Sequence, residues 1–399
     1  MKNTKRECEV LVVGGGSSGI AAAVSASGRG ADTLLIEKNS FPGGSAVAGL
    51  HRFICGLYIN SKQKPKDTLN AGIVREVSSR LQALAPEITI TRIGKVYVLP
   101  FLTKDLKAVF HSLIYRRSHL KVLYNSRGFL VKTDKNRIKV VSVRSPKGTI
   151  DIIPKVVLDC SGEGVIIRLS GAGYRLTPLK QRQLSSYSFR VKGLSTGDDM
   201  ISIKVPYYLK QAIREKKLPA YLKFTTFFPG DDVNEGIFKL SITPTESINS
   251  VACAKSDARE THRYLVSALS SFRGSRITEM SSEVLNREGV RVRGEYSLSA
   301  DDVIKARKFP DGVVKNAWPI ELWDQKKGPQ YQYLKPGDYY QIPLRCLKAK
   351  DIVNLYCAGR CISVSHEALG STRVMGTCMA LGEQAGFAAA RYCLEKANL

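Results

Sequence analysis

The sequence contains no run of about 20 uncharged apolar residues, the length that a membrane-spanning helix requires. Its nine cysteines include no Cys-x-x-Cys pair, so the spacing typical of zinc and iron–sulfur sites is missing, and no metal site is expected. The N-terminal segment Met1–Glu9 is charged and leads straight into an apolar strand, which does not fit a secretory signal peptide. These absences predict a cytoplasmic protein.

The chain is long enough and apolar enough to bury a large core. It has 399 residues, of which 43% are hydrophobic and 24% are charged, a balance typical of globular proteins. A disordered chain, a coiled coil and a collagen-like fibre are thereby excluded. At roughly 150 residues per domain, the length predicts two or three domains.

Positive charge is in clear excess. Lys and Arg number 61 against 35 Asp and Glu, which leaves a formal net charge of +26. Such a charge attracts acidic partners, whether a nucleic acid, an anionic membrane surface or an anionic small molecule, but it is also compatible with a generally basic, solvated surface. The basic residues are spread along the chain, and no nucleic-acid-binding motif is visible.

The strongest motif lies near the N-terminus. The apolar strand Glu9–Val13 is followed by Gly14-Gly-Gly16-Ser-Ser-Gly19 and then by a helix of small residues over 20–27. In this spacing the first glycine permits a tight turn, the second lets backbone N–H groups approach a pyrophosphate, and the third lets helix and strand pack closely. The free N–H groups at the helix N-terminus then favour the negative charge of a phosphate.

A second apolar strand, Thr33–Ile36, ends in Glu37. A carboxylate at this place accepts hydrogen bonds from both ribose hydroxyls and would repel a 2′-phosphate. The two strands, the helix between them and the terminal acid together predict a dinucleotide-binding βαβ unit.

Segments downstream indicate which dinucleotide is bound. Gly43-Gly44-Ser45 follows soon after Glu37, and a glycine pair here lets the backbone run close against an extended, bulky ligand. With this segment the sequence resembles the two-dinucleotide-fold flavoproteins and, among them, the FAD-dependent oxidoreductase family that shares its flavin motif with fumarate reductases. The resemblance also rests on further segments, which are Val156–Gly164, 287–296, Asn354–Ser363, Gly370–Gly376 and an Ala- and Gly-rich helix over 377–392.

The resemblance implies an α/β fold class, with an FAD-binding Rossmann-like domain of the glutathione-reductase type and an inserted α+β substrate domain. We expect a discontinuous FAD domain formed by residues 1–180 and 345–399, with 181–344 as the inserted substrate or cap domain. The elements expected in the FAD domain include a helix at 104–118 and strands at 121–124, 138–143, 149–153 and 156–159.

Within the insertion, alternating patterns predict three strands and one helix. The strands are expected at 185–191, 221–227 and 237–242, and the helix at 252–271. The Pro-, Gly- and Tyr-rich tract 318–340 is expected to be irregular, as in a binding or covering loop.

The motif and the resemblance together imply FAD as the cofactor. The residues expected to contact it are Gly14, Gly16, Ser17, Ser18, Gly19, Glu37, Lys38, Gly43, Gly44, Ser45, Cys160, Ser161, Gly162, Gly359, Arg360, Met375 and Gly376. Many such flavoproteins carry an acidic residue where Arg360 stands, and it bonds the ribityl chain. The family named above often has arginine there, so only the ribityl contact is left open.

The attachment of the flavin is expected to be non-covalent. His51 and Cys55 lie just past the glycine pair, and either could in principle anchor a flavin covalently. The anchor histidine of fumarate reductases, however, would fall nearer Ser45, which cannot serve as that anchor.

Flavin would supply the redox chemistry, and the protein would supply position and electrostatics. The chain has no second Gly-x-Gly-x-x-Gly motif for an NADPH domain and no Cys-x₄-Cys pair for a redox disulfide. We therefore expect direct hydride exchange between flavin N5 and a small organic molecule. The helix after Gly376 is the candidate for stabilising the negative charge of reduced flavin through its N-terminus.

The candidate catalytic residues each have a structural alternative. Arg373 aligns with the arginine of the fumarate-reductase loop that binds substrate carboxylate, and the alternative is a surface ion pair. His366 is either a proton-transfer group or a structural histidine. Arg287, Glu288 and Arg291 match the family's Arg-Glu-x-x-Arg segment and belong either to the active site or to an ion-pair network.

Two classes of function stay open. The favoured one is a flavoenzyme that oxidises or reduces a small organic substrate, anionic or neutral. The other is a flavoprotein that acts on nucleic acid, like the tRNA-modifying flavoenzymes of this fold, and the +26 charge would suit it. It is less favoured because no RNA-binding domain follows the expected flavin helix before Leu399. A homo-oligomer also stays open.

Overall fold

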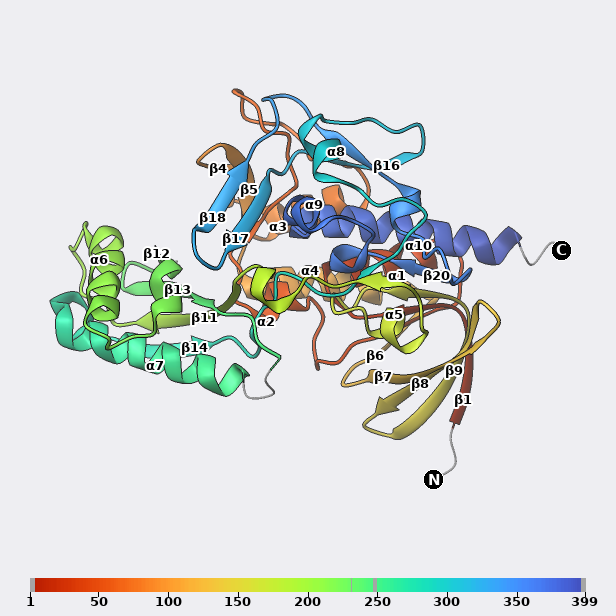
Figure 1. The fold of residues 1–399 in the computed structure, drawn as a ribbon, viewed down its shortest axis with the longest axis horizontal. Helices are drawn as coiled ribbons and strands as arrows, with labels where there is room; N and C mark the ends of the chain where they lie inside the picture. Colours follow the sequence, from red (N-terminus) through yellow and green to blue (C-terminus); the bar gives the residue numbers. More distant parts are fainter. Residues whose placement is uncertain (1–3, 231, 247–249, 396–399) are drawn as a thin grey trace.

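The computed structural model describes residues 4–230, 232–246 and 250–395 (Figure 1). At its centre is a seven-stranded sheet in which β6, β2, β1, β9 and β20 run parallel in that order. β7 and β8 extend it as an antiparallel meander beside β9. The strands are β1 (Thr4–Val13), β2 (Thr33–Ile36), β6 (Leu120–Leu123), β7 (Arg127–Asp134), β8 (Arg137–Ser145), β9 (Gly148–Asp159) and β20 (Leu355–Cys357).

β9 changes its neighbour along its length. β8 pairs with its first half, as far as Ile152, and β20 pairs with its end, from Val157 onward. Pro154 lies between these two stretches on that edge and pairs with Cys8 of β1 on the other. The prediction of two separate strands at 149–153 and 156–159 is therefore wrong, because both segments belong to the single strand β9.

Alternate residues of the central strands are buried on opposite faces of the sheet. Val10 and Val12 of β1 pack in the cluster that contains α1 and α10, whereas Leu11 and Val13 pack on the other face. Burial on both faces explains why the end of β1, Val10–Val13, is continuously apolar.

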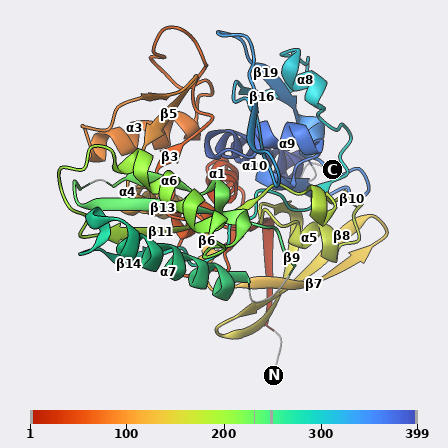
Figure 2. The same ribbon diagram turned by 60° about the vertical axis from the view of Figure 1, so that its left-hand side comes forward.

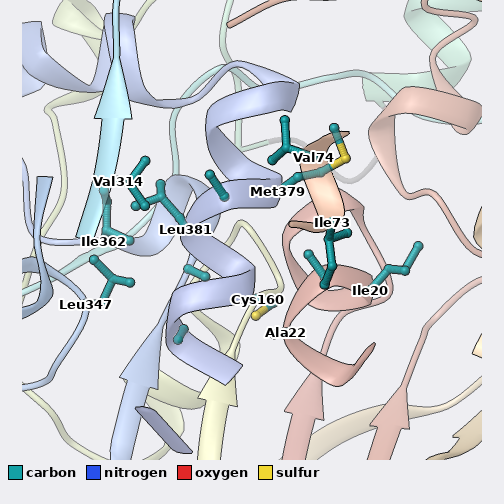
Figure 3. Packing of buried hydrophobic residues seen from close by; sticks show 14 of the residues in the cluster. Ile20, Ala22, Ile73, Val74, Cys160, Val314, Leu347, Ile362, Met379 and Leu381 are labelled. Atoms are coloured by element: carbon teal, nitrogen blue, oxygen red, sulfur yellow. The ribbon is translucent and has the colours of Figure 1, made fainter. Parts of the chain in front are cut away.

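Helices α1 (Ser17–Ser27) and α10 (Met375–Glu395) lie against each other over the sheet, and side chains from both fill the core between them (Figure 3). A Cβ at Gly382 or Gly386 would lie only 2.0 or 2.2 Å from a backbone oxygen of α1. Small residues thus let the two helix backbones approach closely, and the helices expected at 20–27 and 377–392 are confirmed.

The remaining elements of the larger body surround this pair. The helix expected at 104–118 is α4. The elements are α2 (Ser45–Ala48), β3 (Phe53–Ile54), α3 (Ile73–Leu84), β4 (Thr91–Ile93), β5 (Val96–Pro100), α4 (Thr103–Tyr115), α5 (Val165–Leu169), β10 (Tyr174–Arg175), β15 (Arg291–Val292), α8 (Ala300–Ile304), β16 (Gly312–Asn316), β19 (Tyr340–Pro343) and α9 (His366–Thr372).

A second lobe projects from this body and has a core of its own (Figures 1 and 2). It is a four-stranded antiparallel sheet in the order β12-β13-β11-β14, packed against two helices. Phe189 and Phe238 stack at its centre with ring centroids 4.6 Å apart. The elements are β11 (Ser185–Lys192), α6 (Ile201–Arg214), β12 (Thr226–Pro229), β13 (Glu235–Ile242), α7 (Ser250–Ala268) and β14 (Arg276–Met280).

Two expectations for this lobe are corrected. The strand expected at 221–227 is a 3₁₀ turn, Ala220–Phe224, followed by the short β12. The sequence analysis predicted no element over α6, which has Pro206 inside the helix. Burial of Val205, Leu209 and Ala212 on one side of the helix outweighs the low helix propensity of that proline.

The tract 318–340 was expected to be irregular throughout, but only part of it is. It contains an antiparallel hairpin of β17 (Ile320–Asp324) and β18 (Gly328–Gln332). The Asp324 carboxylate accepts hydrogen bonds from two backbone N–H groups in the turn, and Gly328 takes the positive φ of 78° that closes it. The hairpin lies against α9.

The domain boundaries stay a prediction, but packing indicates a smaller insertion. The separate core of the second lobe runs from Tyr187 to Phe272, whereas Leu298, Val314 and Tyr340 pack in the cluster that contains α1 and α10. In the part of the chain that the structure describes, no helix is both long and apolar enough to cross a membrane.

Candidate active site

The turn between β1 and α1 is shaped by its glycines. A Cβ at Gly14, where φ is +102°, would lie 2.7 Å from the carbonyl oxygen of Cys160, and a Cβ at Gly19 would lie 1.7 Å from that of Gly14. A Cβ at Gly16 would meet nothing within 4 Å, because this glycine faces open space in a cavity. The first and third glycines therefore serve packing, and the second leaves the backbone accessible to a ligand.

The acid at the end of β2 lies beside this turn. Glu37 is 3% exposed and accepts hydrogen bonds from the backbone N–H groups of Gly15, at 2.5 Å, and Asn39, at 2.8 Å. Burial raises the pKa of its carboxyl, and those two hydrogen bonds oppose the rise. Lys38 next to it forms an ion pair with Glu283 at 2.7 Å.

The predicted glycine pair closes against the first glycine turn. The N–H of Gly43 donates to the carbonyl oxygen of Gly15 at 2.8 Å, and a Cβ at Gly44 would lie 2.8 Å from the Cα of Gly16. Both glycines have positive φ, at 113° and 51°. The backbone of the glycine pair thus approaches the backbone of the first glycine turn more closely than a side chain at Gly44 would allow.

The turn after β9 is held by a buried carboxylate. Asp159 is fully buried and accepts hydrogen bonds from the hydroxyl and N–H of Ser161 and from the N–H groups of Ile166 and Ile167 at the start of α5. Burial raises the pKa of Asp159, and these donors oppose that rise. The aspartate fixes the conformation in which Cys160 and Ser161 line the cavity.

Arg360 lies across the same turn. Its guanidinium pairs with Glu163 at 2.9 Å and donates to the carbonyl oxygens of Gly162, at 3.3 Å, and Asn286. The positive charge that replaces the acid of other flavoproteins is therefore neutralised locally by Glu163.

The junction between α9 and α10 forms the opposite wall. Met375 begins α10, and the N–H of Gly376 donates to the carbonyl oxygen of Cys55 at 2.8 Å. A Cβ at Gly376 would lie 2.8 Å from the backbone of Gly56, so this glycine permits close contact between two segments.

These segments enclose one continuous cavity. The predicted cofactor residues that line it are Gly14, Gly16, Ser17, Ser18, Glu37, Lys38, Gly44, Ser45, Cys160, Ser161, Gly162, Gly359, Arg360 and Met375. Gly19, Gly43 and Gly376 are not among the residues that line it and make the backbone contacts described above.

One end of this cavity gathers positive charge. Lys239, Arg287 and Arg373 line it together with a single carboxylate, Glu321, and we call these four residues the cationic end. Burial and the neighbouring Arg373 lower the pKa of Arg287 to about 9, so it stays charged at neutral pH. Burial and the charges of Lys239, Arg287 and Arg373 lower the pKa of His51, which also lines the cavity, to about 3.

The two tryptophans of the chain hold Glu321 in place. The indole N–H groups of Trp318 and Trp323 donate to different oxygens of its carboxylate, at 3.1 and 2.6 Å. Burial raises the pKa of Glu321, but the charge of Arg373, the hydrogen bond from Trp323 and the charges of Arg287 and Lys239 outweigh burial, so the pKa lies below its ordinary value. The guanidinium carbon of Arg287 lies 4.2 Å from the centroid of the Trp323 ring.

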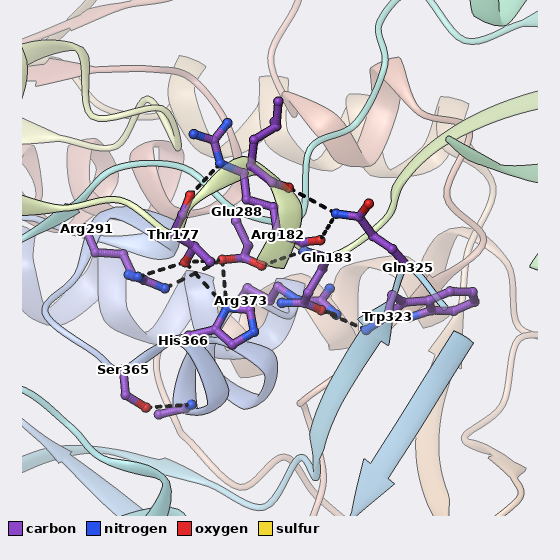
Figure 4. A network of polar contacts seen from close by, with 12 residues as sticks. Thr177, Arg182, Gln183, Glu288, Arg291, Trp323, Gln325, Ser365, His366 and Arg373 are labelled. Atoms are coloured by element: carbon purple, nitrogen blue, oxygen red, sulfur yellow. Dashed lines mark hydrogen bonds and ion pairs between the residues drawn. The ribbon is translucent and has the colours of Figure 1, made fainter. Parts of the chain in front are cut away.

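The other predicted catalytic residues form a separate network (Figure 4). Nδ1 of His366 lies 3.0 Å from Oε2 of Glu288, and Arg291 lies 3.7 Å from that same oxygen. Thr177 donates to Glu288 at 2.7 Å and accepts from Arg291 at 3.0 Å. None of these side chains borders the cavity among the described residues, and Glu288 reaches the cationic end through the N–H of Gln183.

Comparison with known proteins decides the family. The model of the FAD-dependent oxidoreductases matches residues 9–399. The chain belongs to this family. FAD is therefore the cofactor of the enzyme, and the resemblance on which the sequence analysis relied is confirmed. No curated protein matches the chain in sequence.

Solved flavoenzyme structures share the fold at low sequence identity. OxyS anhydrotetracycline hydroxylase from Streptomyces rimosus matches with a TM-score of 0.52 at 12% identity, over 96% of this chain and 62% of the hydroxylase. BexE, studied for oxidation during BE-7585A biosynthesis, matches with a TM-score of 0.51 at 11% identity, over 98% of this chain and 63% of its own. The chain thus spans about three fifths of the length of these proteins, and the likeness shows the fold alone.

The cavity of this FAD-dependent oxidoreductase fits its cofactor. The first N–H groups of α1 have no partners within the helix, and Ser17 and Ser18 at that end line the cavity. Gly16 leaves space where a phosphate would need it, and Glu37 offers a carboxylate at the end of β2.

Sequence reasoning missed three residues of the site. Lys239 carries a visible signal, since it interrupts the apolar strand β13, and Glu321 carries one in lying between two tryptophans. Gln183 carries none, although its Oε1 accepts from both Arg373, at 3.3 Å, and the backbone N–H of Trp323, at 3.1 Å.

Proposed function

We propose that the enzyme exchanges a hydride between its flavin and a small anionic organic molecule bound at the cationic end of the cavity. The observation that carries the proposal is the excess of positive charge there. Lys239, Arg287 and Arg373 stand against Glu321 alone, and both oxygens of that carboxylate already accept indole hydrogen bonds. Three buried or partly buried cations that share a single carboxylate cost free energy, and an anionic substrate would offset that cost.

Arg373 is the residue best placed to hold such an anion. One end of its guanidinium donates to the side chain of Gln183 and the backbone oxygen of Glu321, at 3.3 and 3.1 Å, which fixes the plane of the group. Its Nε has no hydrogen-bond partner among the described residues. Nε is buried, but the side chain borders the cavity and its guanidinium is held at one end, which suits the binding of a carboxylate by its remaining donors.

The chain's own residues would bind FAD without a covalent bond. Backbone N–H groups of the turn from Gly14 to Gly19 and the first turn of α1 would hold the pyrophosphate, and Glu37 would bond the adenosine ribose. When bound, flavin accepts or returns two electrons as a hydride at N5. The N-terminus of α10, which follows Arg373, supplies the favourable dipole for the negative charge of the reduced ring.

The second lobe, which is the inserted one, contributes to the cationic end of the cavity rather than to the end expected to bind the cofactor. It supplies Lys239 from β13, while Arg287 follows the lobe and Arg373 belongs to the FAD domain. We therefore assign the lobe as the substrate domain. The network of Glu288, Arg291 and His366 would act by positioning, through Gln183, rather than by touching substrate.

The proposal is tested by rapid mixing of the oxidised holoenzyme with candidate reductants. Each alcohol or amine would be offered both as a carboxylate and as its uncharged methyl ester, with the absorbance of the flavin recorded. We expect bleaching by at least one carboxylate and a much slower reaction with its ester. Equal rates for every acid and ester pair would contradict an anionic substrate, and Arg373→Met should remove the difference between the two.

A further inference from the structure

The side chain of Lys239 differs from the other two cations of the cationic end in having no hydrogen-bond or ion-pair partner among the described residues, a feature that anion binding alone does not require. It lies on β13 of the inserted lobe, its side chain borders the cavity, and its Nζ is 6.0 Å from the centroid of the Trp323 ring. In the described part of the chain its ammonium forms no ion pair and no hydrogen bond. Arg287 and Arg373, by contrast, each donate to backbone oxygens.

The other ionisable groups near Lys239 are held in one protonation state at neutral pH. Glu321 is kept ionised by two indole donors and the arginines. His51 stays neutral for the reason given above. Burial and the charge of Glu321 raise the pKa of the Cys55 thiol to about 12, and the two arginines remain cations.

We propose that Lys239 is the residue that exchanges a proton with the substrate while the hydride moves. This inference rests on the proposed function. In the oxidation of an alcohol or amine, the C–H bond breaks and its electron pair leaves with the hydride to the flavin. The O–H or N–H bond breaks at the same centre, its proton goes to the neutral Nζ of Lys239, and a C=O or C=N bond forms. The substrate loses two electrons and the flavin gains them, so the step balances.

The electrostatic surroundings suit this role. Burial is the largest influence on Lys239, and with the charges of Arg287 and Arg373 it lowers the pKa of the ammonium to about 8, against the opposing charge of Glu321. A lysine beside other cations in a desolvated site is a recurring way to obtain a neutral amine near physiological pH. Both protonation states are then accessible, as general acid–base catalysis requires.

The first test needs no substrate. The holoenzyme is labelled with trace acetic anhydride between about pH 6 and pH 10, and the acetylation of individual lysines is read by peptide mass spectrometry. We expect the reactivity of Lys239 to rise with a midpoint near pH 8. Lys192 on the neighbouring β11 is the internal control, because hydrogen bonds to Asp232 and Glu235 raise its pKa. A midpoint for Lys239 as high as that of Lys192 would overturn the proposal.

The second test separates proton exchange from fixed positive charge. With a reductant that bleaches the wild-type flavin, Lys239→Arg keeps a cation that cannot deprotonate, and Lys239→Met keeps neither charge nor proton. We expect both to slow bleaching by at least about 100-fold while FAD content is unchanged. Small primary amines should partly restore Lys239→Ala, and Lys192→Met should bleach like the wild type.

The two ways of failing are distinguishable. If Lys239→Arg retained most of the wild-type rate, Lys239 would be a fixed cation for the substrate anion, and the proton-exchange role would be wrong while the proposed function stood. If no carboxylate bleached the flavin faster than its ester, the proposed function would fail, whatever the labelling midpoint of Lys239.

Discussion

The indole N–H of Trp323 donates to Oε1 of Glu321 at 2.6 Å, the shorter of the two indole bonds that this carboxylate receives. The bond joins two residues of one strand, β17, and orients the ring against which Arg287 lies. A hairpin at the edge of the cavity thus arranges the charges at the cationic end.

Glu321→Gln should loosen this arrangement and lower the pKa of Lys239. The glutamine amide has one oxygen and no charge, so it cannot accept both indole hydrogen bonds as the carboxylate does. A hydrogen bond to a charged group typically contributes about 1.5–3 kcal/mol. The charge of Glu321 raises the pKa of Lys239, so its removal should move the acetylation midpoint of Lys239 below pH 8. An unchanged midpoint would show that the two side chains do not interact.

Glu37→Ala should weaken the retention of FAD. The carboxylate borders the cavity and also holds the backbone of the glycine turn through Gly15. We expect affinity to fall by about 10- to 100-fold, equivalent to losing one charge-assisted hydrogen bond or slightly more. Flavin release during dialysis measures the change, and the exposed Glu7→Ala is the matched control. Equal retention in both variants would remove Glu37 from the cofactor site.

Acid precipitation of the holoprotein should leave the flavin in the supernatant. His51 and Cys55 both border the cavity, but a thiol with a pKa raised to about 12 supplies almost no thiolate to form a covalent bond. The measurement is absorbance of the supernatant together with peptide masses from the pellet. A flavin mass on a peptide that contains His51 or Cys55 would refute the non-covalent assignment.

Glu288→Gln should destabilise the fold in a pH-dependent way. Burial raises the pKa of Glu288, but hydrogen bonds from His366, Gln183 and Thr177 outweigh it, so the folded pKa lies below the ordinary value. Its stabilising contribution, about 2 kcal/mol, is therefore complete above about pH 4.3 and lost as the pH falls through the lowered folded pKa.

Unfolding by denaturant at neutral and acidic pH checks this expectation. The difference in free energy of unfolding between wild type and Glu288→Gln should shrink in acid, whereas the exposed Glu87→Gln should be neutral throughout. A difference that did not change with pH would mean that packing, and not charge, accounts for the effect.

The cofactor end could be predicted from the sequence because its determinants are local. The steric demands on Gly14, Gly16 and Gly19 arise within one turn, and Glu37 follows the next strand directly. Short-range rules of spacing therefore describe this end well.

The cationic end could be predicted only in part. The family resemblance pointed to Arg287 and Arg373, whereas Lys239 and Glu321 lie in separate parts of the chain and reach the cavity only through the folding of the second lobe and the β17–β18 hairpin. The composition of the tract 318–340 predicted a loop, because it does not reveal that Asp324 and Gly328 form a hairpin turn.

Substitution of Arg373, with turnover and flavin reduction potential measured together, tests the central claim most directly. If Arg373 holds the substrate anion, Arg373→Lys should keep FAD and its potential but lose most of kcat/KM, because the charge remains and the planar fork is lost. If Arg373 only stabilises the reduced flavin, Arg373→Lys should lower turnover less than Arg373→Met does, and the flavin reduction potential should fall in Arg373→Met. Both variants turning over at the wild-type rate with an unchanged potential would contradict the placement of the active site.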